Sequence, residues 1–376
     1  MEIIAIIIVA VALYIVQSVV YRRFAFKKLR YDCSFSKDEV YEGERIELNE
    51  ELSNYKWLPV PWVKTEITTS RWLNFAGNQA EVTHDARYVP SFFYARAYKR
   101  IRRSWNVVCE KRGVYSVDRI TVVASDLFGS GCGSMPVDVH TSVTVLPGTV
   151  DLDGMFISSR YLQGDTVVRR QLVTDPFRIS GVREYSPSDP MKSIHWLSSA
   201  KEGRLMVKNE EYTTRQSLTV VLNMQSIRYE KFQVVESERI ENCIRVAATL
   251  LENTLESNMP VRLMANYSDR KEGHDCLDSG ESWGQWHVTE QFRTLARMAM
   301  TSSLDFESYL TLYAPEMNST DVAVVTAYLD GFVYDFARAK ALDGINVTIY
   351  ALSIPSEPIP DDCRVFLPVQ RGGAKR

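Results

Sequence analysis

The first twenty residues limit this chain more than any other feature. From Ile3 to Val20 nearly every residue is Ile, Val, Ala or Leu, no residue is charged, and Tyr14, Gln17 and Ser18 are the only mild interruptions. As a helix rising 1.5 Å per residue, this stretch is about 27 Å long, close to the thickness of the hydrocarbon core of a bilayer. The sequence therefore predicts a transmembrane helix over residues 3–20 that contacts the lipid bilayer from Ile3 to Val20.

The charges around this stretch predict its orientation. Five cations follow it without an acid among them: Arg22, Arg23, Lys27, Lys28 and Arg30. The positive-inside rule then predicts a single-pass protein of the cell membrane with its body in the cytoplasm. A cleaved signal peptide would need a basic region before the apolar stretch and small residues after it, and neither is found here. A buried core helix is the other alternative, but a helix that is apolar all round seldom finds enough protein to cover it.

The composition narrows the class of the body. The chain has 376 residues, enough for two or three domains, and its net charge of −3 argues against a nucleic acid partner. Its six cysteines form no CxxC pair, which fits reduced thiols in a cytoplasmic body, although pairing would be open to an extracellular one.

Residues 31–150 have the pattern of a β-sandwich-like domain. Hydrophobic residues from Val137 to Val145 alternate with polar ones, which is typical of a half-buried antiparallel strand. Prolines and the glycines Gly129, Gly131 and Gly133 supply turns at the spacing that a sandwich needs.

Residues 215–370 have the pattern of a doubly wound α/β domain. Strands are expected at residues 218–222, 261–264, 322–326 and 347–352. Helices are expected around residues 240–255, 292–299 and 306–313, and from Gly331 to Leu342. Residues 151–214 then form a connecting segment.

The connecting segment holds a dense cluster of charged and aromatic residues. Arg183, Lys192 and Lys201 are placed to pair with acids at 184, 189 and 210, with Trp196 packed beneath them. Taken from the residues alone, this cluster is a structural clamp.

The same cluster resembles a known bacterial family, catalogued as domain of unknown function 58. Its Arg-Glu-Tyr, Pro-Gly-Asp, Trp and Ser-Ala-Arg series is matched by Arg183, Glu184, Tyr185, Pro187, Asp189, Trp196, Ser199 and Ala200, followed by Lys208 and Glu210. Ser188, His195 and Lys201 depart from the family pattern. The run from Ser125 to Gly129 also resembles the family's Asp-Pro-Phe-Gly element, with Leu127 in place of proline.

The resemblance carries expectations about fold and partners. It implies that the C-terminal half is a von Willebrand factor A-like domain. It also implies frequent genetic association with MoxR-type AAA+ ATPases and, in many genomes, with transglutaminase-like membrane proteins. No biochemical activity is established for the family.

The position of a metal site in such domains has lost its ligands here. Asp-x-Ser-x-Ser after the first strand supplies the oxygens that a divalent cation prefers. This chain has Asn223, Gln225 and Ile227 at those three positions, with Ser226 out of phase, while Thr326 and Asp330 alone make a poor site. We expect neither a metal nor another cofactor.

Two functional hypotheses follow. The first is a non-catalytic, membrane-tethered adaptor or scaffold that works with a MoxR-type ATPase in envelope-related assembly. The second is an envelope-associated enzyme that uses Arg183, Glu184, Asp189 and His195. Walker A, zinc-protease and nucleophile-elbow motifs do not occur in the sequence, which favours the first.

Three further features have structural and functional interpretations. Cys132 between two glycines is more simply a tight turn than a nucleophile, and His195 more often completes a hydrogen-bond network than acts as an acid or base. Trp283, Trp286 and His287, after the charged loop at residues 269–281, form either a partner-binding edge or a cap over the sheet.

Overall fold

The chain forms two compact units in the computed structural model, which describes residues 2–76, 81–83, 86–129, 131–158, 174–186, 194–212, 216–230, 233–268, 276–355 and 358–368. The first unit comprises residues 1–149 together with 292–298, and the second comprises residues 150–291 and 299–376. Each unit has its own sheets.

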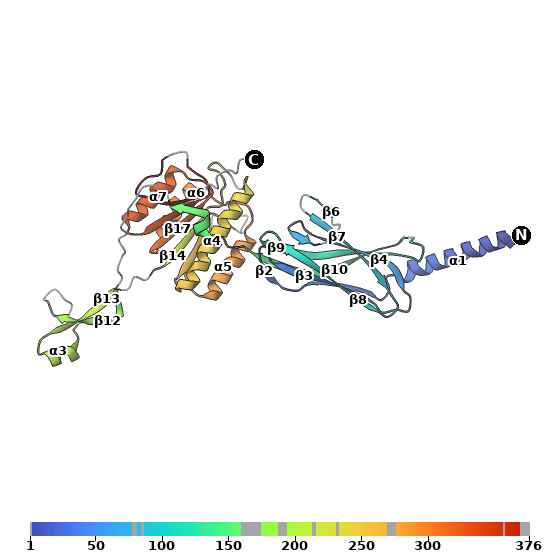
Figure 1. The fold of residues 1–376 in the computed structure, drawn as a ribbon, viewed down its shortest axis with the longest axis horizontal. Helices are drawn as coiled ribbons and strands as arrows, with labels where there is room; N and C mark the ends of the chain where they lie inside the picture. The colour runs from blue at the N-terminus through green and yellow to red at the C-terminus, as the bar shows by residue number, and fades with distance from the viewer. Residues whose placement is uncertain are drawn as a thin grey trace. The chain divides into compact units, whose positions relative to one another are not determined.

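The first unit is a β-sandwich joined to an N-terminal helix (Figure 1). One sheet has the order β1-β3-β8-β5 and the other β2-β10-β9-β4-β7-β6. Their bounds are β1 Leu29–Phe35, β2 Glu39–Tyr41, β3 Arg45–Asn54, β4 Val60–Ser70, β5 Leu73–Phe75, β6 Glu81–Val82, β7 Ala86–Ala95, β8 Arg100–Cys109, β9 Gly113–Ser125 and β10 Gly131–Leu146. Neighbouring strands are antiparallel except for β2 and β10, which run parallel.

Alternation along the strands forms the sandwich core. In β10 the side chains of Val139, Val143 and Val145 are buried, and those of Asp138 and Ser142 are exposed, as the sequence predicts. Every second side chain along these strands points inward, and those from both sheets form one hydrophobic cluster.

Helix α1 (Glu2–Phe24) joins the sandwich through a buried contact. Ala25, directly after the helix, is fully buried in the sandwich core, and the Nζ of Lys56 donates a hydrogen bond of 2.8 Å to its carbonyl. The segment Ile3–Phe24 is long and apolar enough to cross a membrane, by length and composition.

The second unit contains a seven-stranded, mainly parallel sheet of order β11-β19-β18-β17-β14-β15-β16. Its strands are β11 Phe156–Ser158, β14 Leu218–Leu222, β15 Val261–Ala265, β16 Leu277–Asp278, β17 Asp321–Thr326, β18 Asn346–Ala351 and β19 Arg364–Pro368. The five central strands β19, β18, β17, β14 and β15 run parallel to one another. The edge strands β11 and β16 each run antiparallel to their neighbour. Counted from β14 in chain order, the strands from β16 to β19 follow the doubly wound order 3-2-1-4-5-6.

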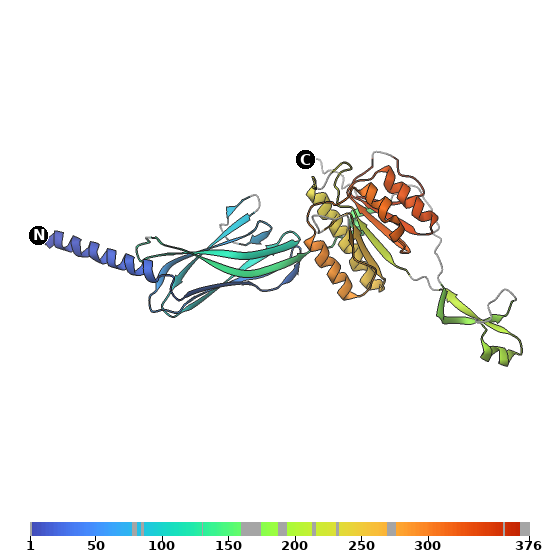
Figure 2. The same ribbon diagram turned by 180° about the vertical axis from the view of Figure 1, so that it is seen from behind.

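Helices cover this sheet (Figures 1 and 2). Their bounds are α2 Leu152–Met155, α4 Ser237–Ser257, α6 Phe306–Tyr313 and α7 Gly331–Leu342, with a 3-10 turn at Ala314–Glu316. Helix α5 (Gln285–Arg297) begins in the second unit, and its residues from 292 belong to the first. Residues of α6 and α7 share one buried cluster with β17 and β18. Asp305 and Asp330 cap the N-termini of α6 and α7 by accepting backbone N–H groups. The helix predicted to reach Ala299 ends at Arg297.

The segment expected to be a connection contains regular structure. Besides β11, it holds a two-stranded antiparallel sheet of β12 (Thr174–Glu184) and β13 (Met206–Tyr212), with helix α3 (Trp196–Glu202) between them. The family-motif residues therefore lie on a hairpin.

Among the described side chains, five cysteines are not in disulfide bonds: Cys33, Cys109, Cys243, Cys276 and Cys363. Burial is the largest cause that raises the pKa of Cys33 to about 12 and that of Cys109 to about 11. Both thiols therefore stay protonated near neutral pH.

Candidate functional site

The candidate site lies where the strand order of the α/β sheet reverses. β14 pairs with β15 on one side and β17 on the other, so the chain leaves in opposite directions after Leu222 and Thr326. In open α/β sheets, ligands bind outside the carboxyl ends of the strands at such a point.

Three polar side chains at this edge bind one another. Asn223, which follows β14, donates through Nδ2 to Thr326 Oγ1 at 3.0 Å and accepts through Oδ1 from Asn266 Nδ2 at 3.3 Å. Asn266 also accepts from the backbone N–H of Met224 at 2.7 Å. All three side chains are fully buried, so their polar groups are satisfied inside the protein.

Gln225 continues this network into the loop after β14. Its Nε2 donates to the Glu230 carbonyl at 2.6 Å, and its Oε1 accepts from the Phe306 N–H at 2.8 Å. Tyr328 donates to the same oxygen at 3.4 Å, and burial, the largest cause, raises the pKa of its phenol to about 12. The phenol thus keeps its proton as a donor.

A buried glutamate holds the rest of the loop. Glu230 accepts from the backbone N–H groups of Ser226 and Val235 and from the Ser226 hydroxyl at 3.0 Å. Ser226, expected to be out of phase with a metal site, is therefore bound to Glu230. Ile227 is partly exposed. Among the described residues, no group of three His, Cys, Asp or Glu side chains is arranged to hold a metal ion.

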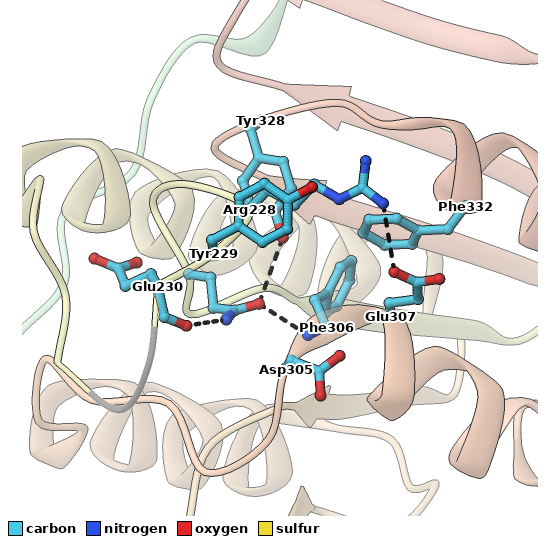
Figure 3. A pocket seen from close by; sticks show the side chains of 9 residues that line it. Arg228, Tyr229, Glu230, Asp305, Phe306, Glu307, Tyr328 and Phe332 are labelled. Carbon is cyan, nitrogen blue, oxygen red and sulfur yellow. Dashed lines mark hydrogen bonds and ion pairs between the residues drawn. The ribbon is translucent and has the colours of Figure 1, made fainter.

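A pocket of about 270 Å³ opens beside this loop (Figure 3). Aromatic rings of Tyr229, Tyr328 and Phe332 line it together with Arg228. Tyr229 is 84% exposed, so a large aromatic side chain stands at the rim in water.

Arg228 combines charge and stacking at this rim. Its guanidinium lies 2.6 Å from Asp330 and 3.7 Å from Glu307, and 5.4 and 5.9 Å from the ring centroids of Tyr229 and Phe332. These distances permit ion pairing and cation–π attraction together. The rim therefore presents an aromatic and charged surface typical of protein interfaces.

The described family-motif residues are not among those that line this pocket, and they belong to the β12–β13 hairpin. Arg183 in β12 is opposite Val207, and Lys208 in β13 is opposite Val182, while Asp189 lies outside the described residues. Glu184 is exposed and pairs with Arg204 at 3.3 Å. Arg204 was not among the predicted partners of Glu184.

Helix α3 carries the remaining motif residues. His195 is its N-cap, and its Nδ1 accepts from the Ser198 N–H at 3.2 Å. Ser199 receives the Met206 N–H at 2.8 Å, which fastens α3 to β13. Trp196 is 66% exposed and Ala200 is exposed, so the expectation that Trp196 packs under the charges is wrong. The short helix itself has no buried residue.

The other candidates are separate. Cys132 lies in β10, where its side chain is outside the described set. Trp283 and Trp286 are exposed, whereas His287 is buried with its Nε2 3.0 Å from the Val261 carbonyl. The charged loop before them is described only from residue 276.

Sequence reasoning missed Glu230, Asn266 and the exposed Tyr229. Asn266 follows β15, and a polar residue directly after a buried strand is a usable signal. Glu230 gave no such signal, because its partners Ser226 and Val235 meet it only through the fold of the loop.

Comparison with known proteins gives a family match and distant matches to solved structures. No curated protein matches the chain. A cohesin from the archaeon Archaeoglobus fulgidus is 10% identical, covers 31% of this chain and 91% of its own, and has a TM-score of 0.22. The CARDB domain of the PF1109 protein from Pyrococcus furiosus is 14% identical over 30% of this chain and 90% of its own, with a TM-score of 0.19.

The family comparison covers the hairpin and most of the α/β sheet. Residues 181–361 match the family described as Protein of unknown function DUF58, in agreement with the resemblance at the Arg-Glu-Tyr, Trp and Ser-Ala residues.

Proposed function

We propose that this protein is a membrane-tethered, non-catalytic adaptor whose α/β unit binds a partner protein. In this proposal α1 crosses the bilayer once, and the α/β unit is a von Willebrand factor A-like domain that recognises its partner at the carboxyl edge of the sheet. Support for the fold assignment comes from the doubly wound order of β14 to β19 and the antiparallel edge strand β16.

One observation supports the adaptor role above the others. At the edge where such sheets bind ligands, the side chains of Asn223, Asn266 and Thr326 bind one another. The exposed charged and aromatic side chains, Arg228 and Tyr229, line the pocket beside this edge. Tyrosine and arginine are among the residues that contribute most to protein interfaces. The arrangement therefore suits a protein surface better than a small ligand at the strand ends.

The candidate partner is a MoxR-type AAA+ ATPase, in envelope-related assembly. A transglutaminase-like membrane protein is the second candidate. Both come from the family resemblance, and the pocket contributes only the chemistry of the contact.

Affinity purification of the full chain from gently solubilised membranes tests the proposal. We expect an AAA+ protein to be enriched, and Tyr229→Ala to lower its recovery at least about five-fold, the effect of losing roughly 1 kcal/mol of binding free energy at an interface centre. Leu312→Ala is the control, because Leu312 is also large and exposed in the same unit but lies outside the pocket.

Each negative result of the purification would reject a different part of the proposal. If no AAA+ protein is recovered, the named partner is wrong. If the partner is recovered equally well with Tyr229→Ala but is lost with Trp286→Ala, the contact lies at the exposed tryptophans instead of the pocket.

A further inference from the structure

The turn between β9 and β10 lies against the N-terminal helix rather than in open solvent. The ring centroid of Phe128, in this turn, lies 5.7 Å from that of Tyr14 in the helix. Gln17 Nε2 donates a hydrogen bond to Asp126 Oδ2 at 2.8 Å. Figures 1 and 2 show the teal turn close to α1 in both views. The turn thus faces the helix at two positions inside the apolar stretch.

The depth of this contact in a membrane follows from its position along the helix. Tyr14 precedes Val20, the last apolar residue before the cations, by six residues, which is about 9 Å at 1.5 Å per residue. If Ile3 to Val20 lie in the hydrocarbon, the tip of the turn lies about 9 Å below its boundary. A folded turn at that level must be compatible with lipid.

The tip has the side chains that this position requires. Leu127 and Phe128 are 57% and 71% exposed, which is costly in water and favourable in hydrocarbon. The carboxylate of the turn is bound internally, since Asp126 is 1% exposed and accepts from Gln17 and from the Phe128 N–H at 3.0 Å. A buried and hydrogen-bonded carboxylate can be tolerated near lipid where a bare one cannot.

Aromatic residues surround the point where the helix meets the sandwich. Tyr55 donates its N–H to the Lys28 carbonyl, and Tyr98 donates its N–H to the Lys56 carbonyl, so both loops lie at the helix junction. Trp57, between them in sequence, and Trp62, which pairs with Ser125 at the start of the turn, are both exposed. Tryptophan and tyrosine at this level form the belt typical of membrane interfaces.

Cations complete this surface. The helix is followed by Arg22, Arg23, Lys27, Lys28 and Arg30, and the Lys27 ammonium lies 4.8 Å from the centroid of the Phe24 ring. Basic residues beside a membrane helix are attracted to anionic headgroups. The junction therefore combines an apolar tip, an aromatic belt and positive charge. These match the hydrocarbon core, the interface and the anionic headgroups of one bilayer leaflet.

We infer that this end of the sandwich is a lipid-binding surface that sits on an anionic bilayer, with Leu127 and Phe128 inserted into the hydrocarbon beside α1. The inference rests on the membrane anchoring proposed above. It makes the sandwich a peripheral membrane domain held by two elements, so the helix and the turn together fix its tilt on the membrane.

Depth-dependent quenching in the full chain tests this. Phe128→Cys, Tyr14→Cys, Trp57→Cys and Val114→Cys each add one cysteine to the six of the chain. Each variant is labelled with a fluorophore in liposomes that contain anionic phospholipid, and the labelled parent chain supplies the background from the native cysteines. Val114 is an exposed control about 35 Å from Ser125 along the same strand, at roughly 3.3 Å per residue.

Acyl-chain nitroxide lipids should quench the probes at residues 14 and 128 at least about two-fold and leave the probe at 114 unchanged. Headgroup nitroxide lipids should quench the probe at 57, and less so in purely zwitterionic liposomes. Quenching at 14 without quenching at 128 would refute the inserted turn but keep the anchor. If the probe at 14 is not quenched, the anchor itself is wrong, and an unquenched probe at 57 would refute the interfacial belt.

Discussion

Glu50 shows at the scale of a single residue how the sandwich is held together. It is 1% exposed and accepts from Tyr31 at 2.6 Å, Thr65 at 3.1 Å, Ser91 at 2.6 Å and Trp105 at 2.6 Å. Tyr31 and Trp105 belong to the sheet of Glu50, and Thr65 and Ser91 to the opposite sheet. Burial is the largest cause, with Glu50 next, that raises the pKa of Tyr31, so this phenol remains a donor.

We expect Glu50→Gln to lower the free energy of unfolding by on the order of 2 kcal/mol. The amide has one acceptor oxygen, which the Trp105 N–H requires, so its NH₂ group has to donate to the Tyr31 and Thr65 hydroxyls. Four hydrogen bonds to a charged acceptor are then replaced by weaker neutral ones. Denaturant unfolding of the full chain in detergent measures the change. Glu47→Gln in the same strand is the control, because Glu47 is exposed. Equal losses in the two variants would show that the four hydrogen bonds contribute little.

At the scale of elements, the joint between α1 and the sandwich depends on a buried amine. Lys56 is 7% exposed and donates to the carbonyl of Ala25 at the end of the helix. Burial lowers the pKa of Lys56 from 10.5 to about 8. The favourable position of a cation at a helix C-terminus therefore has a desolvation cost.

This pKa predicts a stability that rises with pH. Between about pH 8 and 10.5 the unfolded chain binds more protons at Lys56 than the folded chain, so the free energy of unfolding increases through this window, by about 2 kcal/mol from this group. Lys56→Met should remove that rise, whereas Lys64→Met, at a partly exposed position, should keep it. Unfolding of the full chain at pH 7.5 and pH 10 in detergent provides the comparison. Parallel pH profiles for the parent and Lys56→Met would contradict the assignment.

The loop after β14 shows the other way in which elements position a site. Glu230 binds both ends of the described loop through Ser226 and Val235, and this holds Arg228 and Tyr229 at the pocket rim. The aromatic rim is thus positioned by the buried carboxylate of Glu230, a residue that also lines the pocket.

At the scale of the whole molecule, the membrane anchoring proposed for α1 determines which compartment contains the α/β unit. An ATPase partner requires a cytoplasmic body, and that orientation depends on the five cations after α1. An extracellular body would therefore exclude the proposed ATPase partner.

Protease added to intact cells should leave the body uncut, and permeabilisation should expose it. Replacing Arg22, Arg23, Lys27, Lys28 and Arg30 by glutamine should give a mixed orientation, because the charge difference across the helix is removed. Replacing Arg100, Arg102 and Arg103 by glutamine is the control, since these residues are far from the helix in sequence. Digestion of the parent chain in intact cells would place the body outside.

Local features were predictable in detail. Residues 218–222 and 331–342 form β14 and α7 with the predicted bounds, because a continuous apolar run and a capped amphipathic segment are properties of neighbouring residues. The replacement of the metal-ligand residue types by Asn223, Gln225 and Ile227 was also visible in the chain. The exposure of Trp196 was not, because burial depends on whether other elements cover a side chain.

By itself the sequence determined the apolar helix, its basic flank, the strand and helix periods and the family motif, since each depends on residues close in the chain. Only the tertiary structure decided that Asn223 meets Asn266 and Thr326, 43 and 103 residues away, that Glu50 bridges two sheets, and that Phe128 lies against Tyr14. Those contacts are set by strand order and by the packing of sheets. Many different pairings satisfy the same local pattern, and only the folded arrangement selects one of them.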